Sequence, residues 1–355
     1  MGPQHPSTHG VLQLKLTVDN EVVLKVEPVI GYLHRGMEKL WENRTYTQIL
    51  PFTDRLDYLA AISNNLGYVL AVEKLLGLEI PKRAQYIRVI LTELQRIASH
   101  IAWVGFMAND IGAASVLLYT FDEREDILEI FEEYVGARLT INAMRIGGVP
   151  FDISENIIAR INKCLVEIPK KIKDIERLLS ANRIWLHRTK NIGVMSGEAA
   201  MNFGITGPCL RASGVKWDIR KNIPYSSYED FDFDIAYGTN CDVYDRYAVR
   251  LEEMHQSMRI IRQAIDKLPA GEIQTKVPKV LKVPAGEVFY SIENPKGELG
   301  FYIKSNGTDK PERVKMKSPS FINMQALETM CKGYLFADVV AILGSLDIVL
   351  GEIDK

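Results

Sequence analysis

The first ten residues place two histidines in a segment that cannot form a helix. His5 and His9 lie among Pro3, Pro6 and Gly10. Proline lacks an amide N–H and extends the residue before it, and glycine permits turns. Imidazoles titrate near neutral pH, so a loop that holds two of them suits proton transfer. A terminus rich in His and Pro is also typical of a tag remnant, a frayed end or an adventitious metal site, so this segment alone does not identify an active site.

The residues that follow predict a β-hairpin that anchors this loop. Polar and apolar residues alternate at 11–18 and again at 21–26, with Asp19-Asn20 as the turn between them. Farther along, apolar periodicity and capping residues predict a series of long helices. These are expected at 31–40, 54–76, from Pro81 past Ile101, from Asp122 to about Gly148, at 152–179 with Asp152 and Glu155 at its start, and at 243–268.

The C-terminal part has a different texture. Pro, Gly, Lys and short β-type runs at 286–292 and 299–303 fill 271–317, and helix is expected again from Phe321 to the apolar stretch 337–350. The sequence therefore predicts an α+β fold: a central bundle of long helices, an N-terminal β-hairpin sheet and a small C-terminal β region. Three units are expected: an N-terminal loop and hairpin at 1–30, the helical core at 31–270, and at 271–355 the β region with a C-terminal helix that returns to the core.

Charge and hydropathy exclude several classes of protein. There are 43 Lys and Arg against 45 Asp and Glu, a net charge of -2, so no overall field favours nucleic acid. The apolar run 339–346 is far shorter than the roughly 20 residues that a membrane helix needs, and no signal-peptide pattern opens the chain. We expect a soluble or peripheral protein on the cytoplasmic side.

The four cysteines are dispersed. Cys164, Cys209, Cys241 and Cys331 include no C-x-x-C pair, so the spacing favours ordinary buried thiols over a disulfide framework or a cysteine-bound metal.

Six separated segments together resemble the 49-kilodalton-type subunit of respiratory complex I, a relative of the large subunit of nickel-iron hydrogenases. They span nearly the whole chain in the family's order, and the resemblance implies the hydrogenase large-subunit fold. The segments are Gly2–Val11 (GPQHPSTHGV), Gly31–Lys39 (GYLHRGMEK), Asp54–Tyr58 (DRLDY), Leu210–Lys221 (LRASGVKWDIRK), Lys296–Gly300 (KGELG) and Ala337–Asp347 (ADVVAILGSLD).

This resemblance implies a quinone site between this subunit and a small partner that carries a 4Fe-4S cluster. The quinone-contacting histidine of the family falls on His9, the quinone-contacting tyrosine on Tyr58, and the acid behind the histidine on Asp110. Quinone reduction places charge on carbonyl oxygens that must be stabilised and protonated, which suits a phenol and an imidazole. Asp110 would fix the tautomer of His9. His5 would lie close to the acceptor or only shape the loop.

Alternatives remain open for two of these residues. Tyr58 could be a core tyrosine of a helix, and Asp110 could be a helix C-cap or a partner in an interhelical ion pair.

The hydrogenase comparison implies that this chain binds no metal. Counted from Asp347, the second cysteine pair of those enzymes becomes Val349 and Glu352, and the first falls near 57–60, where there is no sulfur. Valine and carboxylates cannot replace thiolates around a soft metal centre. The resemblance therefore implies an acceptor pocket in the place of the metal, with Asp57, Tyr58 and Val349 beside it.

Three further positions match the neighbourhood of the partner's cluster. Arg35 and Arg55 correspond to arginines that would raise the cluster potential, although surface ion pairs with Glu38 or Asp57 are the ordinary alternative. Many family members carry a histidine shortly after the Gly-x-Arg at 136–138, and here that position is Thr140. Without this titratable group, the cluster potential should depend little on pH, as for low-potential acceptors such as menaquinone or methanophenazine.

The expected function is therefore that of the electron-acceptor subunit of a complex I-like, ion-translocating oxidoreductase. It would work with the cluster-bearing subunit, other peripheral-arm subunits and membrane-arm subunits, at the cytoplasmic face of a membrane. The donor stays open among NADH, reduced deazaflavin and ferredoxin. The alternative is a redox-inactive helical scaffold in a hydrogenase-like or deazaflavin-oxidising complex.

Overall fold

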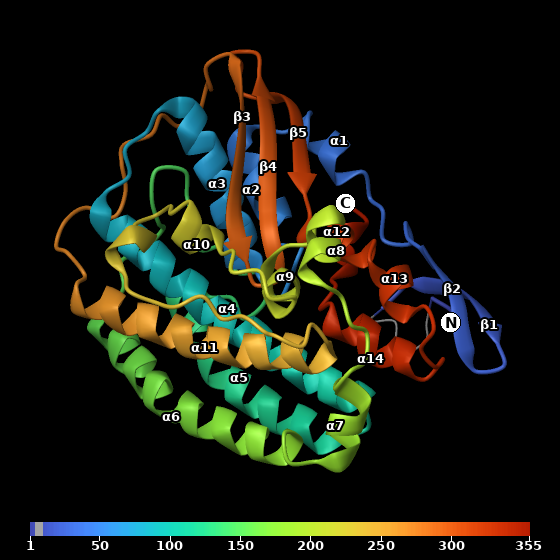
Figure 1. Cartoon of the computed structure of the whole chain (residues 1–355). Helices are drawn as coiled ribbons and strands as arrows, with labels where there is room; N and C mark the ends of the chain where they lie inside the picture. The colour runs from blue at the N-terminus through green and yellow to red at the C-terminus, as the bar shows by residue number, and fades with distance from the viewer. Residues whose placement is uncertain (4–9) are drawn as a thin grey trace.

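The computed structural model describes residues 1–3 and 10–355. Four long helices form its centre: α4 (Lys82–Asp110), α5 (Ala114–Val135), α6 (Glu155–Leu179) and α11 (Val243–Asp266). They lie alongside one another in the lower half of the molecule in Figure 1. Helix α4 is buried along most of its length because α5 and α11 both pack on it, whereas α6 buries only one face. That face is made by residues three or four apart: Ile157, Ile161, Leu165, Ile168, Ile172, Ile175 and Leu179.

The N-terminal hairpin consists of β1 (Gln13–Asp19) and β2 (Val22–Val29), paired antiparallel as predicted. Asn20 occupies the turn with φ 53, a backbone conformation that Asn tolerates better than most residues. Leu14, Val23 and Val26 are buried. The hairpin is tied to the C-terminal part of the chain, because Val23 donates its amide N–H to the Tyr334 carbonyl at 2.9 Å.

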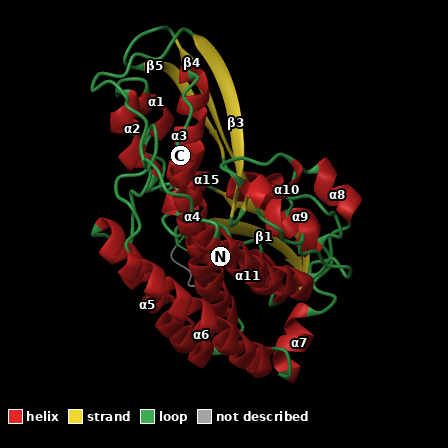
Figure 2. Ribbon diagram, turned by 90° about the vertical axis from the view of Figure 1, so that its left-hand side faces the viewer, coloured by secondary structure: helices red, strands yellow, loops and turns green. Residues whose placement is uncertain are grey.

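The second sheet contains β3 (Gly286–Asn294), β4 (Gly297–Ser305) and β5 (Pro311–Lys317) in the antiparallel order β3-β4-β5. It packs against α3 (Ala61–Leu76), as Figure 2 shows. The approach is close at Gly67, where an added Cβ would lie 3.2 Å from the Phe301 ring. With two sheets and a helical bundle, the α+β class is confirmed.

Two predicted N-terminal helices are placed wrongly. The helix expected at 31–40 shrinks to α1 (Met37–Trp41), because the Asp354 carboxylate accepts the amide N–H groups of Gly31 and Leu33 at 2.8 Å each and holds 31–36 as a loop. The helix expected at 54–76 begins only at Ala61. A separate helix, α2 (Tyr46–Thr53), precedes it with a capping box at Thr45, so residues 54–60 form a turn between two helices.

Three other helix boundaries also differ from expectation. Helix α5 begins at Ala114 and ends at Val135, because Gly136 with its φ of 76 stops it, so 136–149 is a loop. Ser154, not Asp152, caps α6, since its hydroxyl accepts the Ile157 N–H at 3.2 Å. The C-terminal helix is broken into α14 (Asp338–Ser345) and α15 (Leu350–Ile353), with Asp347 at φ 55 between them.

Short elements complete the chain: α7 (Arg183–Thr189), α8 (Gly197–Asn202), α9 (Gly207–Ala212), α10 (Ile219–Asn222), η2 (Tyr228–Asp230), α12 (Pro319–Met324) and α13 (Leu327–Cys331). One apolar core includes Leu14, Trp103 and Phe301, which come from all three predicted units. The unit boundaries near 30 and 270 therefore remain predictions. Within the described residues, no helix combines the length and apolar character needed to cross a membrane.

Candidate functional site

A pocket of about 430 Å³ opens where four separate segments meet. The turn 54–60 and helix α4 form two sides, and the start of α5 and the loop between α14 and α15 form the others. Most of the lining side chains are apolar, with a few polar groups among them, which is the usual make-up of a small-molecule site. The lining residues are Tyr58, Leu59, Trp103, Phe106, Asn109, Asp110, Leu117, Asp347, Ile348 and Val349.

Helix α4 supplies one wall because Trp103, Phe106 and Asp110 are spaced three and four residues apart and so share a face. The Trp103 indole is fixed on both sides. Its Nε1–H donates to the Gly344 carbonyl at 2.7 Å, and the Arg250 guanidinium lies 4.1 Å from the ring centroid. This wall is therefore rigid.

Tyr58 lies on the turn 54–60 and is 42% exposed. A core tyrosine in a helix, the alternative considered from the sequence, is thus excluded by its position. Partial burial raises the pKa of the Tyr58 phenol above its ordinary 10, and the neighbouring Asp57 carboxylate raises it further. The phenol is therefore protonated at neutral pH and can donate a hydrogen bond into the pocket.

Asp57 does not line the pocket but is fully buried behind it. Its Oδ2 lies 3.1 Å from the Lys296 ammonium, which comes from the turn between β3 and β4. Lys296 also donates to Ser99 Oγ at 3.3 Å and lies 3.6 Å from Asp347 Oδ2. This lysine joins the segment that carries Tyr58 to the segment that carries Val349. The sequence named Lys296 only as part of the family motif at 296–300. The feature that could have pointed to a role for it is the presence of a lysine within a buried hairpin.

The positions that hydrogenases fill with cysteine come close together. At Gly351 an added Cβ would lie only 2.6 Å from the Leu56 carbonyl oxygen, so α15 rests directly on the backbone before Asp57. Val349 lines the pocket, and Glu352 is buried behind it. Burial, and next the charge of Asp57, raise the pKa of Glu352 to about 7. The sequence analysis named Glu352 only because it stands where hydrogenases have a cysteine.

His5 and His9 lie outside the described residues. Gly10, the residue after His9, is close to the start of α15, because an added Cβ there would lie 3.3 Å from Leu350 Cδ1. Asp110 is the last residue of α4 and faces the same pocket as Tyr58. Of the residues expected at the site, Tyr58, Asp110 and Val349 are thus brought together.

Arg35 and Arg55 are both exposed. Neither pairs with Glu38 or Asp57: Glu38 lies 3.4 Å from Arg313 and 3.0 Å from Lys315, and Asp57 pairs with Lys296. Arg55 makes its ion pair with another acid, Asp54, at 3.7 Å, and donates to the Pro51 carbonyl at 2.5 Å, so the ordinary alternative of an ion pair holds for Arg55.

Thr140 lies in the loop 136–149 with φ 52, an unusual conformation for a β-branched residue. Two residues later, the Asn142 amide donates to the buried Asp54 carboxylate at 3.2 Å. Burial raises the pKa of Asp54 to about 6, while hydrogen bonds from Asn65 and Asn142 lower it. The loop of Thr140 and the turn of Arg55 therefore meet at Asp54, a contact that no sequence pattern indicated.

No group of three or more His, Cys, Asp or Glu within the described ranges is arranged to hold a metal ion. All four cysteines are free thiols; Cys164, Cys209 and Cys331 are buried and Cys241 is partly exposed. A second hollow of about 440 Å³ lies beside Tyr290, and two of its four charged residues, Glu73 and Arg88, are paired with each other at 2.6 Å.

The fold agrees with the comparisons to known proteins. The family model described as respiratory-chain NADH dehydrogenase, 49 Kd subunit, matches residues 110–282 and 275–355, more than two-thirds of the chain. The chain belongs to this family.

Similar proteins from several bacteria are named as one subunit of NADH-quinone oxidoreductase. The protein from Solibacter usitatus is 56% identical over 356 residues, which cover 100% of this chain and 96% of the relative. The protein from Dehalococcoides mccartyi is also 56% identical, with 100% and 97% covered. The protein from Geotalea uraniireducens is 52% identical over 380 residues, again with 100% and 97% covered.

Proposed function

We propose that this chain is the electron-acceptor subunit of a complex I-like, ion-translocating oxidoreductase and that it reduces a membrane quinone or quinone-like carrier in the pocket beside Tyr58. The observation that carries the proposal is that Tyr58, Asp110 and Val349, from three distant parts of the sequence, line one pocket. The names of the relatives support quinone as the acceptor.

The chemistry assigned to the pocket is hydrogen bonding and protonation of two carbonyl oxygens. The Tyr58 phenol, protonated at neutral pH, donates to one oxygen as charge develops on it. His9 donates at the other, and Asp110 fixes the tautomer of His9. The position of Gly10 beside Leu350 supports this assignment because it brings the chain next to His9 close to the pocket loop.

The electrons come from a 4Fe-4S cluster in a small partner subunit. Arg35 and Arg55 are exposed and so are available to a neighbour, where a guanidinium would stabilise the reduced cluster. The chain itself binds no metal and is not active alone. In the assembled complex the chain lies with other peripheral-arm subunits on the cytoplasmic face of the membrane. The membrane-arm subunits use the free energy released by reduction of the acceptor for ion transport.

The identity of Thr140 assigns a class of acceptor. Threonine has no proton to gain near neutral pH, so cluster reduction couples weakly to protonation. This property suits low-potential carriers of the menaquinone or methanophenazine type.

The test is Tyr58→Phe in the intact complex. It removes one hydrogen-bond donor and keeps the ring, so turnover should fall about tenfold to a hundredfold, as expected for loss of roughly 1.5–3 kcal/mol in the transition state. Tyr119→Phe is the matched control, because Tyr119 is 57% exposed on α5 and does not line the pocket. Assembly should be normal in both. Turnover of Tyr58→Phe equal to the control with a short-chain quinone would contradict the proposal and favour the scaffold alternative.

A further inference from the structure

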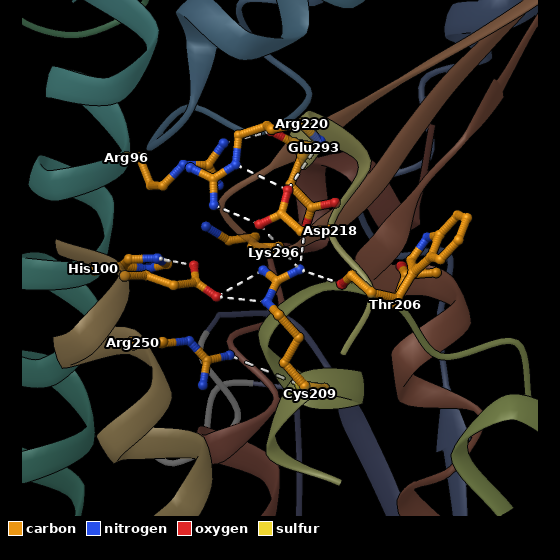
Figure 3. A network of polar contacts seen from close by, with 12 residues as sticks. Arg96, His100, Thr206, Cys209, Asp218, Arg220, Arg250, Glu293 and Lys296 are labelled. Carbon is orange, nitrogen blue, oxygen red and sulfur yellow. Dashed lines mark hydrogen bonds and ion pairs between the residues drawn. The ribbon is translucent and has the colours of Figure 1, made fainter. Parts of the chain in front are cut away.

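Four buried charged residues meet directly behind the acceptor pocket. We call them the Lys296 cluster: Lys296, Asp57, Asp347 and Glu352, none more than 5% exposed. The ammonium lies 3.1 Å from Asp57 Oδ2 and 3.6 Å from Asp347 Oδ2. Lys296 is fully buried, and Figure 3 shows it in the same view as Arg250.

The cluster contains more acids than bases. Lys296 supplies one positive charge, and Arg250, whose Nε lies 3.9 Å from Asp347 Oδ2, supplies a second. Three carboxylates gathered in a buried region repel one another, and burial makes this repulsion costly. The repulsion falls when one of the three carboxyl groups carries a proton.

Glu352 is the group best placed to carry that proton. Its Oε1 accepts the Ser320 amide N–H at 3.0 Å, but no residue within the described ranges donates a hydrogen bond to its buried Oε2. A buried oxygen without a donor costs more free energy when it carries the charge of a carboxylate than when it belongs to a neutral carboxylic acid. Burial and the charge of Asp57 raise the pKa of Glu352 to about 7, so both protonation states are populated at neutral pH.

The charged groups that face Glu352 come from each neighbouring segment. Asp57 approaches from the turn 54–60 and opposes ionisation, while Lys296 approaches from the β3–β4 turn and favours it. Asp347 lies on the loop before α15 and pairs with the same lysine. Lys355, three residues after Glu352, donates to the Met316 carbonyl and also carries a charge near Glu352. Helix α12 contributes the neutral Ser320.

The cluster is mechanically connected to the pocket wall. Ser320, which binds Glu352 through its amide, accepts the Val349 N–H at its hydroxyl at 3.3 Å. Asp57 immediately precedes Tyr58, and Asp347 itself lines the pocket. A charge that appears on an acceptor in the pocket is therefore separated from Glu352 only by the buried wall, where electrostatic interactions are strong.

We propose that Glu352 is a proton-binding site behind the acceptor pocket and that its carboxylate takes up one proton from water when an electron reaches the acceptor. The step balances, since the electron comes from the partner's iron-sulfur cluster and the proton forms an O–H bond at Glu352. The inference rests on the proposed function, because it requires reduction in this pocket. Glu352 does not touch the acceptor. It acts at a distance, because the proton it binds compensates the negative charge that appears on the acceptor.

The test is the reduced-minus-oxidised infrared difference spectrum of the intact complex. In the wild type, a band in the region of protonated carboxyl groups should grow on reduction. Its gain should be small near pH 5.5, where Glu352 already holds its proton, and larger toward about pH 8. Glu352→Gln keeps the size and the Ser320 contact and should abolish the band. Glu352→Asp should keep the band at a shifted position, which provides a readout if the Gln variant does not assemble.

The matched control is Glu38→Gln. Glu38 also accepts a backbone N–H, from Met316 at 3.0 Å, but it is paired with Lys315 and Arg313 and does not line the acceptor pocket. The band should be unchanged in this variant. An unchanged band in Glu352→Gln, or an unshifted band in Glu352→Asp, would overturn the proposal. Quinone turnover of the same samples tests the proposed function separately. If the complex turns over quinone but the infrared band does not change when Glu352 is substituted, only the proposal of a proton-binding site at Glu352 is contradicted.

Discussion

Two buried charged regions of the molecule are built on opposite principles. One is the arginine network in Figure 3, and the other is the Lys296 cluster next to it. In the network, both oxygens of each carboxylate accept a hydrogen bond or an ion pair. In the cluster, Asp57 Oδ2 and Asp347 Oδ2 have ion pairs only, and Glu352 Oε2 has neither an ion pair nor a hydrogen bond among the described residues. The network consists of Arg96, Arg211 and Arg220 with Glu93, Asp218, Glu253 and Glu293.

The arginine network joins elements that are distant in sequence. Arg211 on α9 contacts Glu253 on α11 at 2.6 Å and Glu293 on β3 at 2.7 Å. Arg220 pairs with Asp218 at 2.6 Å. Burial alone would raise the pKa of Asp218, but the two arginines outweigh it and lower the value to about 2. Glu93, Asp218 and Glu253 are therefore held ionised, whereas burial raises the pKa of Glu293.

The difference between the arginine network and the Lys296 cluster shows which buried region can change its charge. Pairing with buried arginines gives the network a structural role, since its carboxylates are held between fixed positive charges. The Lys296 cluster brings three acids together around one lysine beside the pocket, so the number of protons it holds can change when the acceptor is reduced. Even His100 belongs to the fixed part: burial lowers its pKa to about 4, so it stays neutral while its Nε2 contacts Glu253 at 2.9 Å.

The largest effect is expected when the network is broken at Arg211. Arg211→Met leaves two buried carboxylates without their partner and should destabilise the chain by about 3–5 kcal/mol, enough to prevent assembly. Arg259→Met is the control, because its ion pairs with Asp232 and Asp234 are exposed and should contribute little. The yield and thermal stability of the assembled complex measure the difference. Equal yields of the two variants would contradict the structural role of the network.

The two regions should also respond differently to pH. The folded-state pKa of Glu352, about 7, exceeds its ordinary 4.5, so its contribution to stability is full below about pH 4.5 and is lost as pH rises through 7. Asp218 has the opposite sign: its contribution is full above its ordinary 3.8 and is lost only as pH falls through about 2. Between about pH 5 and 8, only the Glu352 region should weaken, by roughly 3 kcal/mol at most.

Hydrogen exchange of the intact complex, corrected for the intrinsic pH dependence, can follow this difference. Peptides that cover 349–355 should lose protection as pH rises, and peptides that cover 211–222 should not. Glu352→Gln should remove the trend in the first set. Parallel behaviour of both peptides in the wild type would mean that Glu352 is ionised like the network acids.

A smaller effect is expected at Thr140, on the side of the site that faces the partner. Thr140→His places a titratable group in the loop that meets Arg55 at Asp54, and it should make the partner's cluster potential depend on pH by up to about 59 mV per unit. Thr140→Asn is the control, since Asn also tolerates the positive φ but does not titrate. A redox titration followed by electron paramagnetic resonance at several pH values measures this. A strong pH dependence in the wild type would show that another group fills the role.

The sequence predicted the long helices and the strands because their periodicity is local. Helices α4, α6 and α11 and strands β1 to β4 lie close to where apolar spacing placed them, whereas β5 was not singled out. The errors occur where a tertiary contact overrides local preference. Residues 31–36 are a loop because Asp354, more than 300 positions away, caps their amides. The turn 54–60 could not be predicted, because the apolar spacing is typical of a helix both before and after it.

The site was only partly predictable for the same reason. Family motifs pointed to Tyr58, Asp110 and Val349, and these share the pocket. They gave no role to Lys296 or Glu352, whose importance depends on which charges approach each other in three dimensions. The close approach of Gly351 to the Leu56 carbonyl is what brings Glu352 beside Asp57, and no spacing in the sequence encodes that contact.

The central claim, that the acceptor is reduced in the pocket beside Tyr58, is tested most directly by labelling the intact complex with a photoreactive quinone analogue. The label should appear on peptides that contain Tyr58 or Val349 and should be displaced by excess quinone. Displaceable labelling at the hollow beside Tyr290, or at no peptide of this chain, would contradict the account.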